Sequence, residues 1–381
     1  MRLENLWFLC ILFYSCQTES GFSGDITIDV GSKRKAYIGQ VGLSSNLPFP
    51  KSTNPNDVGD FLIFNPYSKF IDSVSFKNEE IKIFQGFFLE EEGPDAIGEF
   101  NFFLGSSLGF VFVGNRSIVI KDLKSGEIKK VKFSSDIFGE KSDIFLPGSV
   151  SFLLDHFFKG FDAKKENLYF FVQNMVSGEV ALCKFNIITE ELIRLPDFFD
   201  VDMVSKNENI YRNQLYIMKN NLPYVFYYDE KLILSYSYSN EIVVVNPESL
   251  NFLTKYFDSK LFPNEKSTHQ KLRDDMDFFE ANQTMDEWDF DVSFGNLEKL
   301  PNNKGFCRLI RGATLGEDKK NPEIFIEIFD NELKKVGEAN LTNMQPDLST
   351  FFFAVERRLF FKAKEQPDEN YLNYYFVEVD F

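Results

Sequence analysis

Phe110–Phe133, with the sequence FVFVGNRSIVIKDLKSGEIKKVKF, is the stretch that decides the fold class of this 381-residue chain. β-Branched and aromatic residues crowd into Val111–Val113 and Ser117–Ile120, as half-buried strands require. Gly114–Asn115 tolerates the positive φ angles of a two-residue hairpin turn, so the two runs are predicted to pair. The stretch therefore begins with a β-hairpin.

The second half of the stretch adds a polar turn and a third strand. Lys124–Gly126 predicts the turn, and Glu127–Phe133 mixes the apolar Ile128 and Val131 with lysines. The first strand is thus apolar and the last is half charged. A propeller blade shows this gradient, because its inner strands pack between neighbouring blades and its outer strand faces water. One such unit alone is also compatible with a β-meander in a sandwich.

Looser copies of this unit favour the propeller over the sandwich. Candidate units begin at six positions, separated by about the length of a four-stranded blade with excursions: Asp60, Gly98, Gly148, Pro223, Trp288 and Thr350. Residues 41–59 are predicted to be a loop, and Asp25–Gln40 holds one or two strands that would pair with the last unit. The prediction is an all-β, six-bladed β-propeller with four-stranded antiparallel blades, closed by an N-terminal strand.

One segment interrupts the repeat. Ser259–Glu287 contains no β-branched run and carries charge throughout. We predict an acidic insertion here, with a short helix near Gln270–Glu280. The remainder of residues 25–381 is expected to form a single propeller domain.

The overall charge argues against nucleic acid as a partner. The chain has 41 basic and 58 acidic residues, a formal net charge of −17, and no basic cluster that would offset it. Such a surface repels a phosphate backbone. The 46 phenylalanines indicate that a large core can be built.

The N-terminal sequence predicts that the protein is located in the cell envelope. Residues 1–16, MRLENLWFLCILFYSC, place an apolar run before Ser15 and Cys16. The run is too short to span a bilayer, but it is typical of a secretory signal. A small residue before a cysteine at this point predicts cleavage and lipidation at Cys16. Residues 17–24 would then be a polar tether.

Both the processing of this N-terminal segment and the location of the protein have an alternative interpretation. Glu4 dilutes the basic start, and Phe13–Tyr14 is bulky before the cleavage point, so an uncleaved signal, or an ordinary secretory signal cut near Gly21 or Gly24, is also compatible. We expect a monomer attached to the outer membrane only through its lipid, on the periplasmic or surface face. The alternative is a protein secreted to the periplasm.

Few histidine and cysteine residues are present that could take part in catalysis or bind a metal ion. The only histidines are His156 and His269, and neither accompanies a nucleophile elbow, so a Ser-His-Asp device and a zinc site built on several histidines are not predicted. Cys183 alternates with apolar neighbours, which favours a buried thiol. A disulfide between Cys183 and Cys307 is the other possibility.

The acidic clusters in the sequence leave calcium as a possible cofactor. Asp274–Asp277 and Asp286–Asp291 are the densest groups of carboxylates, but neither has the glycine and terminal glutamate of an EF-hand loop. Solvated surface is the simpler interpretation, and no cofactor is predicted, with calcium as the alternative. Glu92–Pro94 places an acid that could lie at the mouth of the ring, although a Gly-Pro turn between blades explains these residues more simply.

Four motifs stand out together in the sequence. Two are the lipidation signal ending at Cys16, and Glu92, Gly93 and Pro94 followed by Gly98. The others are Ile324–Leu341, IFIEIFDNELKKVGEANL, and Val292–Gly295 leading to Arg308. With these motifs the chain resembles one known family, the six-bladed β-propeller lipoproteins of Bacteroidetes grouped as domain of unknown function 4221. The resemblance covers the mature chain and implies a propeller in the cell envelope. It implies no catalytic residues.

These observations predict a binding or scaffolding module for an envelope protein or a carbohydrate. The repeat, the anchor and the lack of a catalytic motif motivate this hypothesis. The alternative is a carboxylate-dependent hydrolase, lyase or lactonase that uses a bound cation on the same scaffold. Acids converging on an ion would favour the enzyme, whereas aromatic rings and amides would favour binding.

Overall fold

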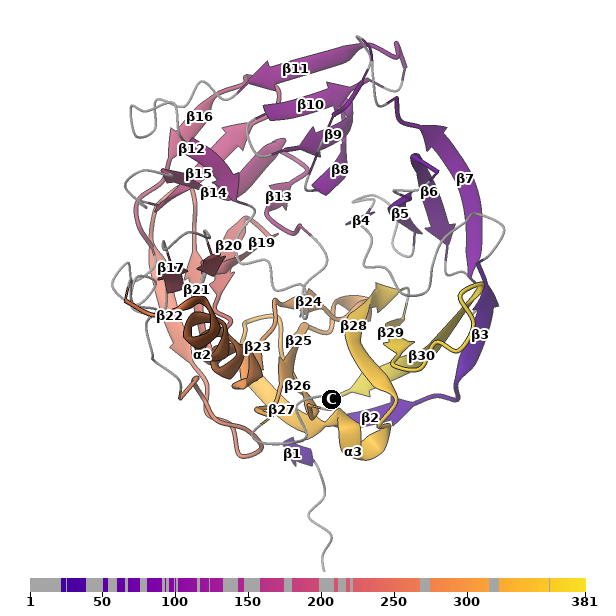
Figure 1. Ribbon diagram of the computed structural model, residues 1–381, viewed down its shortest axis with the longest axis vertical. Coiled ribbons are helices and arrows are strands. Elements are labelled where there is room, and N and C mark those ends of the chain that lie inside the picture. The colour runs from indigo at the N-terminus through magenta and orange to yellow at the C-terminus, as the bar shows by residue number, and fades with distance from the viewer. Residues whose placement is uncertain are drawn as a thin grey trace, which may run out of the picture.

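A computed structural model of the chain describes most of residues 22–381. Besides single residues and pairs, the gaps lie at 39–50, 54–59, 76–80, 133–142, 147–157, 175–179, 199–208, 212–216, 268–274 and 315–321. The described strands form antiparallel sheets arranged as the six blades of a propeller (Figure 1). The predicted fold class is therefore confirmed.

The first three blades follow one another along the chain and are given from the centre outward. Blade 1 consists of β4 (Lys51–Thr53), β5 (Asp60–Asn65), β6 (Phe70–Ser75) and β7 (Lys82–Phe88). Blade 2 consists of β8 (Phe102–Ser106), β9 (Gly109–Val113), β10 (Ser117–Lys121) and β11 (Ile128–Lys132). Blade 3 consists of β12 (Asp143–Leu146) and β13 (Phe161–Asp162), which both pair with β14 (Asn167–Asn174), and then β15 (Val180–Asn186) and β16 (Leu192–Arg194).

The remaining chain forms blades 4 and 5. A two-stranded sheet, β17 (Asn209–Tyr211) and β18 (Ile217–Lys219), precedes blade 4. Blade 4 consists of β19 (Tyr224–Tyr228), β20 (Lys231–Ser235), β21 (Glu241–Val245) and β22 (Phe252–Tyr256). Blade 5 consists of β23 (Ser293–Phe294) and β24 (Glu298–Lys299), which pair with β25 (Phe306–Arg311), then β26 (Ile324–Phe329), β27 (Lys335–Asn340) and, at its edge, β1 (Phe22–Gly24).

Blade 6 joins the two ends of the chain and closes the ring. Its three inner strands are β28 (Leu348–Val355), β29 (Arg358–Ala363) and β30 (Tyr371–Asp380). The outer position is filled by β2 (Thr27–Val30) and β3 (Arg34–Tyr37), which pair with the two halves of β30. Closure by an N-terminal strand is what the sequence predicts. Residues 22–24 were expected in the tether, but they form β1 instead.

The stretch from Phe110 to Phe133 forms the three outer strands of blade 2. Val111 and Ile118 are fully buried, whereas Lys129 and Lys130 of β11 are exposed beside the buried Val131. Gly126 closes the predicted turn with φ of +74° and donates to the Asp122 carbonyl at 2.9 Å. Gly109 opens the hairpin with φ of +135°, and a Cβ there would lie 2.1 Å from the Lys121 carbonyl oxygen. Only glycine fits this position.

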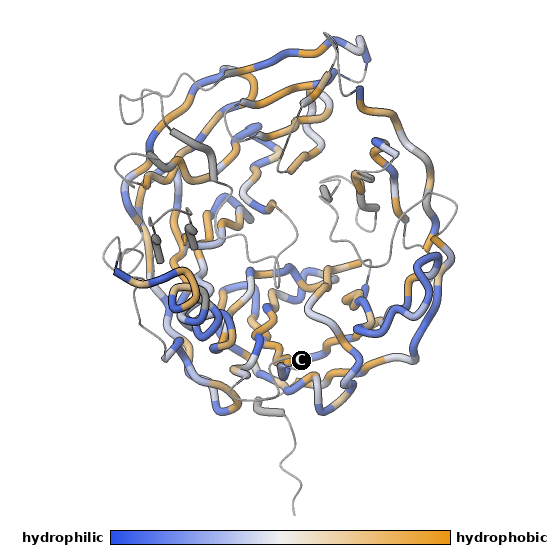
Figure 2. Tube along the Cα trace, in the orientation of Figure 1, coloured by the Kyte–Doolittle hydropathy of each residue, from blue (hydrophilic) through white to orange (hydrophobic). Residues whose placement is uncertain are grey.

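The core consists of one apolar cluster between each pair of neighbouring blades. Between blades 2 and 3, for example, Val111 packs with Phe170, and between blades 5 and 6, Leu309 packs with Phe361. Apolar colour follows the strands of the ring in Figure 2, where it alternates with hydrophilic turns. Each buried aliphatic or aromatic side chain contributes about 1.5–3 kcal/mol, so these six interfaces hold the ring together.

The acidic insertion contains a helix that begins within the predicted range and extends beyond it. The structure has α2 at Phe278–Phe290, which overlaps the predicted range Gln270–Glu280 at Phe278–Glu280, and residues 268–274 lie outside the described residues. Asp277 accepts from the Glu280 amide at 2.8 Å, and Glu280 reaches back to the Asp277 amide at 3.3 Å. This capping box fixes the helix start after the charged run. Two shorter helical segments are Pro301–Asn303, between β24 and β25, and α3 (Leu341–Met344), in the connection from blade 5 to blade 6.

Candidate functional site

A cleft formed by described residues lies on the outer part of blade 4. Its volume is about 640 Å³, and its described lining residues are Asp197, Phe198, Tyr236, Tyr238, Ser239, Asn240, Glu241, Val243, Phe252, Thr254, Tyr256, Phe257, Asp258, Asn264 and Glu265. We call it the blade-4 cleft. Six of these side chains are aromatic, four are acidic and none is basic. The cleft is far from the predicted mouth of the ring, because β22 is the outermost strand of its blade.

Strand alternation sets one face of the cleft. Phe252, Thr254 and Tyr256 line it because residues two apart on β22 point to the same side. Phe252 is 59% exposed and Tyr256 is 76% exposed, so both rings are available to a ligand. Lys255 points the other way and reaches the Leu333 carbonyl of blade 5 at 3.4 Å.

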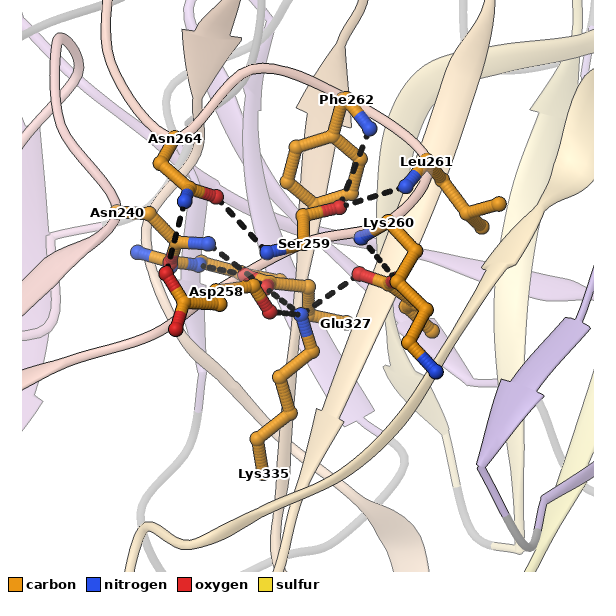
Figure 3. Close-up of polar contacts among 11 residues, drawn as sticks. Asn240, Asp258, Ser259, Lys260, Leu261, Phe262, Asn264, Glu327 and Lys335 are labelled. Atoms are coloured by element: carbon orange, nitrogen blue, oxygen red, sulfur yellow. Dashed lines mark hydrogen bonds and ion pairs between the residues drawn. The ribbon is translucent and has the colours of Figure 1, made fainter.

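The segment after β22 forms a second wall and holds its own shape. Ser259 donates its amide to the Asn264 side chain at 2.8 Å, and Asn264 donates to the Asp258 carboxylate at 3.0 Å. The Ser259 hydroxyl accepts from the amides of Leu261 and Phe262 at 3.0 and 3.1 Å. These local bonds are visible in Figure 3. They replace strand pairing for the backbone of the wall.

A buried ionic network fastens this wall to blade 5. Arg308, Glu327 and Glu338 stand side by side on β25, β26 and β27, where the strand register pairs each with the next. The Arg308 Nε donates to Glu327 at 2.8 Å, and both side chains are fully buried. Glu338 accepts from the backbone amide of Lys260, in the cleft wall, at 2.7 Å.

Lys335 and Asn240 complete the network. The Lys335 ammonium contacts Glu327 at 2.7 Å, Glu338 at 2.6 Å and the Asp258 carbonyl at 2.7 Å (Figure 3). Asn240 donates to Glu327 at 2.9 Å and accepts from Arg308. Two cations therefore face two carboxylates, and the charge balance makes their burial tolerable. The network positions Asn240 and Asp258, which both line the cleft.

The electrostatics of Glu327 follow from these partners. Burial alone would raise its pKa, but the charges of Arg308 and Lys335 and the hydrogen bonds from Lys335 and Asn240 outweigh that effect and lower the pKa below the usual 4.5. Glu327 is therefore ionised at neutral pH. An ionised Glu327 keeps Arg308, Lys335 and Asn240 in one arrangement.

Two of the motif residues predicted from sequence, Gly93 and Gly98, are described by the structure, and neither is among the described residues that line the blade-4 cleft. Gly93 and Gly98 are exposed and have φ angles of +102° and +78°, as turn glycines do. Cys16, Glu92, Pro94, His156 and His269 lie outside the described residues. Cys183 and Cys307 are both buried and free, so the disulfide is excluded in this structure and the buried thiol at Cys183 is confirmed. Burial raises the pKa of the Cys307 thiol well above its usual value.

The acidic clusters of the insertion have structural partners. Asp277 caps α2, and Asp291 accepts from the Ser267 amide at 2.7 Å and hydroxyl at 3.0 Å. Across the described ranges, no three His, Cys, Asp or Glu side chains are grouped so that they could hold a metal ion. The described part of the chain therefore gives no support to a calcium site.

Sequence reasoning missed the blade-4 cleft. Tyr256 and Phe252 look like ordinary members of an outer strand, and the sequence does not show which face of that strand stays uncovered. Some signal was present for the network, because Arg308, Glu327, Lys335 and Glu338 lie in or next to the stretches that carry the family resemblance. A charged residue at the centre of IFIEIF in an apolar strand is such a signal, since an isolated buried charge is costly.

Comparison with solved structures supports the same architecture. A crystal structure of a DUF4221 family member from Bacteroides vulgatus matches with a TM-score of 0.57 and 13% identity, covering 94% of this chain and 99% of that one. A luciferin-regenerating enzyme matches with a TM-score of 0.42 and 10% identity, covering 91% and 95%. An oligogalacturonate lyase in complex with manganese matches with a TM-score of 0.39 and 9% identity, covering 93% and 98%. At 13% identity the likeness to the Bacteroides vulgatus structure concerns the fold.

Sequence comparison identifies the family directly. No curated protein matches the chain. The family model for "Domain of unknown function (DUF4221)" matches residues 20–340, which include the blade-4 cleft and the whole ionic network. The chain therefore belongs to the DUF4221 family, as the motifs around Gly93, Arg308 and Glu327 predicted.

Proposed function

We propose that this protein is a lipid-anchored binding module of the cell envelope that holds a carbohydrate in the blade-4 cleft. The observation that carries the proposal is the pairing of exposed aromatic rings with hydrogen-bonding groups in one cleft of about 640 Å³. Sugars have apolar faces that stack on aromatic rings, and hydroxyl groups that bond to carboxylates and hydroxyls.

The rigid surroundings of the cleft support binding as its function. The ionic network fixes one wall before any ligand arrives, so little ordering cost falls on the binding step. The predicted tether also bears on where the propeller would be located. Only six positions separate Cys16 from Phe22, where β1 begins, so a lipid on Cys16 would keep the propeller within about 20 Å of the bilayer. Among the described residues, no helix has the length and apolar character needed to cross a membrane.

Carbohydrate binding is tested with the purified full chain and a panel of oligosaccharides, by isothermal titration calorimetry. Tyr256→Ala should weaken binding by about tenfold or more, because a stacked ring contributes about 1–2 kcal/mol. Leu253→Ala is the matched control, since Leu253 is 60% exposed on the same strand and is not among the residues that line the cleft. Equal losses in the two variants, or no binding by the panel, would count against this function.

The anchor is tested separately. Cys16→Ser should move the protein from the membrane pellet to the soluble fraction. Retention of this variant in the pellet would contradict lipidation at Cys16.

A further inference from the structure

The charged side chains among the described lining of the blade-4 cleft are all acidic. This shared sign of charge restricts the chemical class of ligand that the cleft would bind. Asp197, Glu241, Asp258 and Glu265 are its acidic lining residues, and no lysine, arginine or histidine is found among the described lining. Asp197 lies 3.8 Å from Arg194, and both side chains are partly exposed. The nearby Lys266 is directed away, because its ammonium donates to the Trp288 carbonyl at 2.6 Å. The cleft therefore presents a negative potential to a ligand.

The aromatic rings add a second preference for a cation. The faces of tyrosine and phenylalanine carry negative electrostatic potential, and ammonium groups bind over them. Tyr256 and Phe252 stand four residues apart on one face of β22, a span of about 13 Å that an oligosaccharide of a few residues can cover. The acidic groups and the rings therefore favour the same sign of charge.

A buried hydroxyl in the lining is a separate sign of a polar ligand. Ser239 is 7% exposed, and its Oγ has no hydrogen-bond partner among the residues that the structure describes. The amide of its neighbour Asn240 is engaged by Glu327 and Arg308. A buried hydroxyl without a partner is costly, and a ligand hydroxyl or amine that reached it would remove this cost.

We infer that the carbohydrate bound by the blade-4 cleft carries free amino groups, as an oligomer of glucosamine does. This inference rests on the proposed function and specifies its ligand. The sugar ring stacks on Tyr256 or Phe252, and the ammonium groups face the carboxylates. An N-acetylated sugar keeps the shape but loses the charge, whereas a uronic acid is repelled.

The experiment compares three tetrasaccharides of glucosamine, N-acetylglucosamine and galacturonic acid by calorimetry with the full chain. The pH is about 6, below the ordinary pKa of an amine, so the glucosamine ligand is charged. We expect the glucosamine tetramer to bind about tenfold or more tighter than its N-acetylated counterpart, and to weaken as salt is raised. The galacturonic acid tetramer should not bind.

Two variants connect this preference to the cleft. Glu265→Gln should reduce affinity for the glucosamine tetramer by about threefold to tenfold and leave the N-acetylated ligand unaffected. Glu332→Gln changes an exposed acid outside the cleft lining and should have no effect. Both positions are exposed, so thermal unfolding should match that of the unchanged protein.

The outcomes separate the inference from the proposed function. Equal or tighter binding of the N-acetylated tetramer would overturn the inference and leave carbohydrate binding in place. No binding of any sugar would overturn both. Binding of a lysine-rich peptide but of no tetrasaccharide would also overturn both, and would identify the cleft as a peptide site.

Discussion

Glu327 is the residue on which the ionic network depends, because it contacts Arg308, Lys335 and Asn240 at once. Its side chain is completely buried in a strand of otherwise apolar residues. Removing one partner of such a group leaves the others charged and without compensation. Removing one charged member should therefore lower the free energy of unfolding more than replacing the whole network with apolar residues would.

Glu327→Gln should lower the free energy of unfolding by about 3–5 kcal/mol at neutral pH, measured by urea denaturation. Glu332→Gln, an exposed change on the same blade, should cost less than about 0.5 kcal/mol. Arg308→Met combined with Glu327→Met should be more stable than Glu327→Gln, since it removes one cation together with one anion. Similar stabilities for Glu327→Gln and Glu332→Gln would show that the network is not a stabilising unit.

The lowered pKa of Glu327 also predicts how this difference changes with pH. A carboxyl group whose pKa is lower in the folded protein stabilises it fully above the ordinary value of 4.5, and the stabilisation is lost as pH falls through the folded pKa. The gap in unfolding free energy between the unchanged protein and Glu327→Gln should therefore be constant above about pH 5 and shrink below pH 4.5. A gap that stays constant down to pH 3 would contradict the ionised state of Glu327.

At the scale of elements, the strands with regular patterns were the predictable ones. The runs Val111–Val113 and Ser117–Ile120 in blade 2 cluster β-branched and aromatic residues, and they form β9 and β10 close to the predicted positions. β4 was missed, because Lys51–Thr53 lies in a segment predicted as a loop and carries no apolar residue. Its pairing with β5 comes from the rest of the blade, which the local sequence does not encode.

The first and last residues of helix α2 were also not predicted from the sequence. Charge and the lack of β-branched residues predicted a helix, but its start depends on the capping box at Asp277 and its end on Asp291. As a result Trp288, predicted to open the fifth blade, is a buried helix residue instead. The cleft was even less accessible to prediction, since it arises where segments distant in the sequence leave a face of β22 uncovered.

Asp277→Ala should lower the free energy of unfolding by about 1 kcal/mol, because it removes the carboxylate that accepts from the Glu280 amide at the start of α2. Asp286→Ala is the matched control, as Asp286 is an exposed acid within the same helix. The comparison is made by chemical denaturation. Equal effects would mean that the cap does not determine the stability of α2.

At the scale of the whole molecule, stability depends on bringing the first and last strands together. β2 supplies the outer edge of blade 6, and Ile28 packs in the cluster between blades 5 and 6. The order of blades was predictable from the repeats. The exact closure was not, because it depends on pairing between residues about 350 positions apart, a distance over which local sequence patterns carry no register.

Deleting residues 1–31 should destabilise the ring by about 3 kcal/mol or more, since it removes the apolar contacts of Ile28 and Val30 and exposes the edge of β30. Deleting residues 1–21 leaves β1 and β2 intact and should leave the free energy of unfolding unchanged. Urea denaturation of the two truncated chains makes the comparison. Equal stabilities would show that the ring does not need its N-terminal strand.

The pairing of β1 with β27 has a mechanical consequence. Ser23 lies opposite Glu338, the residue whose carboxylate holds Lys260 in the cleft wall. Any tension on the chain before Phe22 enters the propeller through three residue pairs on β27, and it reaches the cleft wall before it reaches the closure strand on β30. A pulling force on the N-terminus therefore acts on β27, the strand whose Glu338 holds the wall of the blade-4 cleft.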